Sequence, residues 1–216
     1  MAVATVSVGT FPLRRSAGYR EDPIPSPTGP DGQPVSADSS SLSSLIAATA
    51  HWLTRAYPAD GGALQRGLAE VQARQAVTVA AWLCYPTELD AQLVVLTGPG
   101  GSDRIDRITG ADSRVRTADT DAECDEAWRS WVDEVVASWA ACLLSHPDLA
   151  AAAARALAGT DHGSAVPLAF HRLTRPRAAD HEAAALMRHP DLLEPIARLH
   201  RPRLLVRLDV ETTLAG

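Results

Sequence analysis

The 216-residue chain contains no lysine and no asparagine, and all twenty of its basic residues are arginine. Because the codons for lysine and asparagine both begin with AA, their joint absence indicates a very GC-rich genome, such as that of an actinomycete bacterium. The absence of lysine also excludes a Schiff-base lysine, a lysine general base and a lysine phosphate clamp.

Cysteines and long apolar runs are also scarce. Three cysteines, Cys84, Cys124 and Cys142, cannot all pair within the chain, so we expect free thiols in a reducing cytosol. No apolar run approaches the ~20 residues that a membrane helix needs. The first residues lack the basic segment that precedes the apolar stretch of a secretory signal. We therefore expect a soluble, cytoplasmic protein with no membrane partner.

The remaining composition is typical of a globular domain preceded by an arm. Hydrophobic residues make up 46% and charged residues 21% of the chain, which are ordinary globular values. Residues 20–38 contain five prolines and little apolar periodicity. Residues 1–37 are therefore predicted to form a Pro/Gly-rich, extended or flexible N-terminal arm, either a loose tail or a segment that wraps a neighbouring subunit. Residues 38–216 are predicted to form a single mixed α and β domain.

Apolar residues at helical spacing predict several amphipathic helices. The predicted helices span residues 39–57, 63–74, 121–145, 148–159, 179–189 and 191–200. In the second of them, Leu64, Leu68 and Val71 are expected to face inward. The motif HPDL occurs twice, beginning at His146 and His189. It is predicted to mark points where one helix ends and the next begins at a proline.

Short runs rich in β-branched or apolar residues predict strands. The predicted strands span residues 76–85, 91–98, 103–109, 164–173 and 203–212. The first of these is ambiguous, because the preceding helix can instead continue to Leu83. We therefore predict an α+β (or α/β) fold, a layered domain of about four or five strands with several amphipathic helices.

The motifs for phosphate, cofactor and metal binding are weak. A Gly-rich loop at residues 98–102 follows a predicted strand, but it matches neither the P-loop nor the dinucleotide fingerprint. Pro99 removes one backbone donor and Asp103 places a negative charge beside the loop, so a turn is favoured. The seven histidines show no metal-ligand spacing. We therefore expect no cofactor and no metal.

The sequence contains candidate catalytic residues, but their positions along the chain do not show whether they are in contact. Cys84 near a predicted strand end is the best candidate nucleophile, with His162 as its base and Asp161 as the group that orients the base. Ser164 is a weaker nucleophile candidate, because no G-x-S-x-G elbow surrounds it. A small Cys–His or Ser–His hydrolase or transferase is therefore one alternative function.

Charge is segregated along the chain. Residues 88–134 carry 12 acids and 5 arginines, whereas residues 166–207 carry 8 arginines and 4 acids. The basic residues are predicted to form a partner-binding edge for an acidic protein or, as another alternative function, for nucleic acid. This predicted edge comprises Arg172, Arg175, Arg177, Arg201, Arg203 and Arg207. Internal pairing between the acidic and basic regions is the competing explanation.

The leading hypothesis from these patterns is a non-catalytic interaction or assembly subunit of a bacterial multi-protein system. The Pro-rich arm, the segregated charge and the dispersed catalytic candidates motivate it. Its expected partners are other protein subunits, with self-association as a further option.

Overall fold

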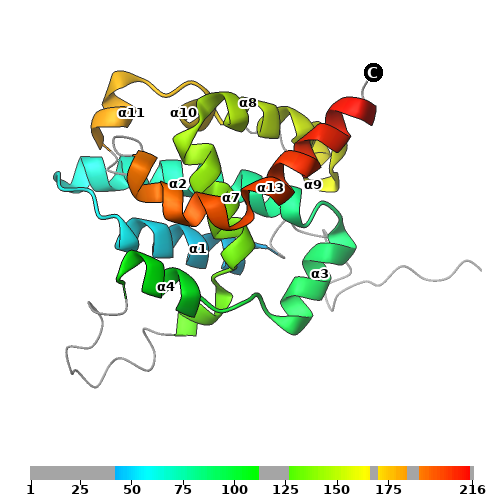
Figure 1. Ribbon diagram of the computed structural model, residues 1–216, viewed down its shortest axis with the longest axis horizontal. Helices are drawn as coiled ribbons and strands as arrows, with labels where there is room; N and C mark the ends of the chain where they lie inside the picture. The colour runs from blue at the N-terminus through cyan, green and yellow to red at the C-terminus, as the bar shows by residue number, and fades with distance from the viewer. Residues whose placement is uncertain (1–41, 112–126, 166–169, 184–189, 215–216) are drawn as a thin grey trace, which may run out of the picture. The chain divides into compact units, whose positions relative to one another are not determined.

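The computed structural model describes residues 42–111, 127–165, 170–183 and 190–214. The predicted arm, residues 1–37, lies outside these ranges. All regular elements within them are helical (Figure 1). In chain order they are α1 (Ser43–Ala56), α2 (Ala63–Cys84), α3 (Glu88–Thr97), α4 (Asp103–Thr109), η1 (Ala127–Trp131), α7 (Glu134–Ser145), α8 (Pro147–Ala156), η2 (Leu157–Gly159), α9 (Asp161–Ala165), α10 (His171–Thr174), α11 (Ala178–Ala183) and α13 (Pro190–Leu214).

The centre of the fold is the helix α7, which crosses α1, α2 and α13 (Figure 1). Ala137, Ala140 and Ala141 of α7 are completely buried. Opposite them, α2 buries a stripe of alanines that includes Ala73 and Ala76. Small side chains let helix axes approach closely, and larger anchors such as Trp52, Trp139, Leu143 and Ile196 fill the space around them.

The layered α+β prediction is wrong, because no strand occurs in the described residues. The segment predicted as a strand at 76–85 forms the C-terminal part of α2 and its C-cap residue. This agrees with the alternative prediction, in which the preceding helix continues to Leu83. Its residues Val77, Val79 and Ala80 are all fully buried. The helix therefore packs on several neighbours, and a helix buried on several sides shows a continuous apolar run that resembles a buried strand.

The strands predicted at 91–98 and 103–109 are helices α3 and α4. A capping box starts α3: the Thr87 Oγ1 accepts from the Asp90 N–H at 3.2 Å, and an Asp90 carboxylate oxygen accepts from the Thr87 N–H at 3.1 Å. These bonds satisfy backbone donors that a helix start leaves free. At the other end Gly98 has a positive φ of 73°, a conformation that costs glycine little.

The strands predicted at 164–173 and 203–212 are also wrong where the structure describes them. Residues 164–165 end α9 and residues 171–173 belong to α10. The second segment continues α13 with Leu204 and Leu208 buried one turn apart. Proline in a helix interior removes one hydrogen bond, yet α13 contains both Pro195 and Pro202 and bends in its middle (Figure 1).

Several helix predictions are confirmed. Helix α1 covers most of 39–57, and α8 with η2 covers 148–159. The first HPDL motif acts as predicted: α7 ends at Ser145, His146 separates the helices and Pro147 opens α8. The second motif begins in residues outside the described ranges, and its proline, Pro190, begins α13.

Two other helix predictions need correction. The 121–145 helix is interrupted, because Asp133 caps α7 by accepting from the N–H groups of Val135 and Val136. The predicted inward face of α2 is also wrong, since Leu64 is 78% exposed and Val71 is 41% exposed. The alanine stripe faces inward instead. No helix in the described part of the chain is long and apolar enough to cross a membrane.

Candidate functional site

The predicted nucleophile Cys84 is the last residue of α2 and is a free thiol. Burial, reinforced by the nearby Asp133 carboxylate, raises the pKa of Cys84 to about 12. The thiolate is the nucleophilic form, so the site keeps this sulfur protonated near neutral pH. Its neighbour Tyr85 donates a 2.6 Å hydrogen bond to Asp133.

The predicted base His162 lies in α9, and its ring contacts α2 and the residue after it. Its Nε2 lies 2.8 Å from the backbone oxygen of Tyr85, and its ring stacks on Trp82 with a centroid separation of 5.5 Å. A carboxylate oxygen of Asp161 accepts from the N–H of Glu88 at 3.3 Å. These contacts tie α9 to the turn between α2 and α3. The backbone of Ser164 belongs to α9, and its side chain lies outside what the structure describes.

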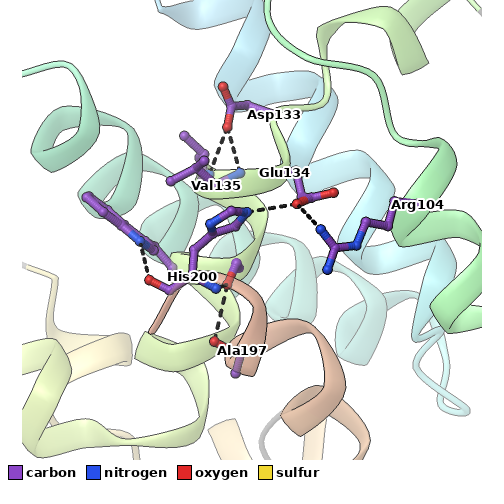
Figure 2. A network of polar contacts seen from close by, with 9 residues as sticks. Arg104, Asp133, Glu134, Val135, Ala197 and His200 are labelled. Atoms are coloured by element: carbon purple, nitrogen blue, oxygen red, sulfur yellow. Dashed lines mark hydrogen bonds and ion pairs between the residues drawn. The ribbon is translucent and has the colours of Figure 1, made fainter. Parts of the chain in front are cut away.

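A polar network joins α4, α7 and α13 (Figure 2). The Nε2 of His200 lies 2.8 Å from a carboxylate oxygen of Glu134, and Arg104 pairs with the same oxygen at 3.3 Å. A carboxylate paired with a histidine fixes the orientation of the imidazole ring. Here it holds the N-terminus of α7 against the bend of α13.

Backbone groups at that bend are satisfied by side chains of α7. The Oγ of Ser138 donates to the Ala197 carbonyl at 3.2 Å and accepts from the His200 N–H at 3.0 Å. The indole N–H of Trp139 donates to the His200 carbonyl at 3.1 Å. Pro202 has no N–H to donate within the helix, and these bonds from α7 support the backbone of α13 just before that proline.

A second network surrounds Asp106 of α4, which is 1% exposed. Its carboxylate accepts from the Trp52 indole N–H at 2.6 Å and from the Ser102 hydroxyl at 3.2 Å. Arg129 completes the network with an ion pair at 3.0 Å. Buried charges require such pairing, so this cluster fixes α4 and η1 onto α1.

Trp128 lines two surface hollows. One, of about 290 Å³, is lined in part by Trp52, Arg55 and Arg129. The other, of about 480 Å³, is mostly apolar and is lined in part by His51 and Trp131. Within the described ranges, no group of three histidine, cysteine or acidic side chains has a metal-binding arrangement.

The six predicted partner-binding arginines lie on two parts of the fold. Arg172, Arg175 and Arg177 lie in or just after α10, and the other three, Arg201, Arg203 and Arg207, lie on α13. Arg172 pairs with Asp180 at 2.6 Å, within the basic C-terminal region. Burial raises the pKa of Asp180, but hydrogen bonds from the Arg177 N–H and from Arg172 outweigh it and hold that pKa below its usual value.

The most distinctive surface is on α3, which lies at the edge of the described fold (Figure 1). Leu89, Leu93 and Leu96 are 75%, 57% and 83% exposed, whereas Ala91 and Val94 are its buried residues. At 3.6 residues per turn the three leucines share one side of the helix, opposite the buried side. We call these three residues the α3 leucine face.

Sequence reasoning missed this surface because it assigned the segment to a buried strand. The signal was present in Thr87 and Asp90, whose spacing of three residues is that of a capping box. Once the segment is a helix, the 4–3 spacing of the leucines follows directly.

Comparisons of the chain with protein-family models, with curated proteins and with solved structures find no match.

Proposed function

We propose that the chain is a non-catalytic interaction or assembly subunit of a bacterial multi-protein system, and that the α3 leucine face is its docking surface. The supporting observation is the exposure of Leu89, Leu93 and Leu96 on a helix that buries small residues. Scattered exposed leucines are ordinary, but a contiguous apolar surface is typical of an interaction site.

Burial of the three leucines would contribute to docking. Fully burying a leucine side chain contributes about 1.5–3 kcal/mol, so three leucines that are more than half exposed supply a useful core for a small interface. The spacing of the leucines is that of a helix whose apolar side lies in a hydrophobic groove of a partner protein. The cytoplasm is the proposed location, and the free thiols of Cys84 and Cys142 support it.

The test is retention of a partner from an extract of the source organism on the immobilised full-length chain. The wild type is compared with a variant carrying Leu89→Gln, Leu93→Gln and Leu96→Gln. The matched control is Leu64→Gln, since Leu64 is 78% exposed on α2. We expect one protein, at a fixed ratio to the bait, to be retained by the wild type and the control and lost with the triple variant.

The thermal midpoint of each variant separates docking from folding. A docking surface predicts that the midpoint of the triple variant lies within about 6 °C of the wild-type value, because each exposed substitution changes stability by about 0.5 kcal/mol or less and each kcal/mol shifts the midpoint by about 2–4 °C. A fall of 10 °C in the triple variant would show that the leucines support the fold, and the proposal would then be wrong.

A further inference from the structure

We infer that the α3 leucine face pairs with the same face of a second copy of this chain, the two α3 helices running antiparallel about a two-fold axis. This inference rests on the proposed function and names the partner for that surface.

The spacing identifies the partner as a helix. Leu89, Leu93 and Leu96 are separated by four and three residues, the alternation that forms the seam between paired helices. The seam occupies a helix of 10 residues, about 15 Å long at 1.5 Å per residue. A helix of the same length with the same seam is a matching partner, and α3 of a second copy is such a helix.

The seam is self-complementary when the second helix runs antiparallel. Leu93 then lies near the two-fold axis, and Leu89 of one copy lies across from Leu96 of the other. A two-fold contact of this kind uses one surface on both copies and closes without leaving a free end. All three leucines of each copy are thus covered by leucine.

The charges on α3 select the antiparallel orientation. Glu88 and Asp90 lie in the first turn, and the last turn has no basic residue. A parallel pair would bring the four carboxylates of two copies to one end. With Leu93 on the axis, the antiparallel pair separates the two Glu88 positions by about 15 Å and the two Asp90 positions by about 9 Å along the helices. Both distances exceed the screening length of about 8 Å at physiological salt.

The residues beside the seam fit the same arrangement. Gln92 flanks the leucines near their midpoint and donates to the Glu88 carboxylate of its own helix at 3.4 Å. It lies beside Gln92 of the second copy, where the second amide N–H of each side chain is available to the amide oxygen of the other. On the other side of the seam, Asp90 lies across from Thr97 of the second copy. No like charges are opposed at either position.

The size of the surface sets the strength of the pair. The α3 leucine face exposes the equivalent of about two complete leucine side chains. This is well below the roughly 800 Å² that each partner of a standard interface buries. We therefore expect a reversible dimer whose population rises with protein concentration.

The first test is sedimentation velocity of the full chain from about 1 µM to about 1 mM. We expect the weight-average sedimentation coefficient to rise from that of a monomer towards that of a dimer. Leu93→Arg places a charge at the two-fold axis and should weaken dimerisation at least tenfold. Leu64→Gln should leave the series unchanged. Leu96→Gln replaces Leu93→Arg if circular dichroism shows that the arginine variant is unfolded.

The second test reports orientation through engineered cysteines. Gln92→Cys lies beside its equivalent near the axis and should form a disulfide-linked dimer under mild oxidation. Thr97→Cys lies about 6 Å along the helix from the axis in each copy, at opposite ends of the pair, and should cross-link at least tenfold more slowly. The wild type, treated identically, measures the contribution of the native cysteines.

The outcomes separate this inference from the proposed function. A wild type that stays monomeric at about 1 mM, but binds another protein through the α3 leucine face, overturns the dimer and leaves the proposed function standing. Faster cross-linking at residue 97 than at residue 92 overturns the antiparallel pair. A dimer unaffected by Leu93→Arg also overturns the inference, because it must use a different surface.

Discussion

Replacing Asp106 with alanine should be among the most destabilising single substitutions in the described fold. The carboxylate accepts hydrogen bonds from Trp52, Ser102 and Arg129 and is 1% exposed. Asp106→Ala leaves the buried indole N–H of Trp52 and the partly buried guanidinium of Arg129 without this partner. It also frees α4, which follows the α3 leucine face in the chain.

The magnitude follows from the loss of a buried ion pair. Removing one partner of such a pair costs about 3–5 kcal/mol. Each kcal/mol lowers the melting temperature of a domain of this size by about 2–4 °C. We therefore expect Asp106→Ala to lower the thermal midpoint by about 6–20 °C, measured by circular dichroism at pH 7. Asp106→Asn keeps an acceptor for Trp52 and should fall between the wild type and alanine.

Two comparisons make this prediction refutable. Asp103→Ala, on the exposed side of α4, should lower the midpoint by only a few degrees. In a double-mutant cycle, Trp52→Phe and Asp106→Ala should be non-additive by about 0.5–3 kcal/mol, since the two side chains are in contact. A loss of less than about 2 °C in Asp106→Ala, or strict additivity in the cycle, would refute the network.

Three further outcomes follow from other buried groups. With its pKa raised to about 12 from 9.0, Cys84 should alkylate on the order of tenfold to a hundredfold more slowly than an ordinary thiol at pH 8, measured by peptide mass spectrometry, because the smaller thiolate fraction outweighs the greater nucleophilicity of a high-pKa thiolate. Ser138→Ala leaves the His200 N–H without its acceptor and should cost about 1–3 kcal/mol in urea unfolding. Because the pKa of Asp180 lies below 3.8 in the folded chain, its stabilisation is present above pH 3.8. That contribution is lost as the pH falls through the folded value, so the midpoints of wild type and Asp180→Asn should converge there.

The sequence predicted helices well where apolar residues are spaced for one buried face. Helix α1 shows this clearly, because Leu45, Trp52 and Leu53 are spaced along one face of the helix and are all buried in the core. The HPDL motif at His146 was equally predictable, since proline suits the first turn of a helix. These signals are local and depend little on which other segments pack nearby.

The strand predictions failed where burial came from tertiary packing. Val77, Thr78 and Val79 favour a strand by propensity, but helix packing around α2 overrides that preference. In α13, the helix was predicted to end at His200 and a strand to follow from Arg203, whereas the helix continues and side chains of α7 bond to backbone groups around its bend. No local pattern encodes a contact across more than fifty residues.

The same limit applies to the candidate site. The links from Trp52 to Asp106 and from Glu134 to His200 join residues 54 and 66 positions apart. Separations of this length along the chain do not by themselves predict that two residues are in contact. The α3 leucine face differs, since a capping box and a 4–3 spacing encode it locally.

The claim that the α3 leucine face is a protein-docking surface is tested most directly by hydroxyl-radical footprinting in intact cells of the source organism. Modification of Leu89, Leu93 and Leu96 is compared with that in the purified chain at about 1 µM, and Leu64 serves as the internal control. We expect severalfold protection of the three leucines in cells and unchanged modification of Leu64. Equal modification of all four leucines in cells and in dilute solution would contradict the account.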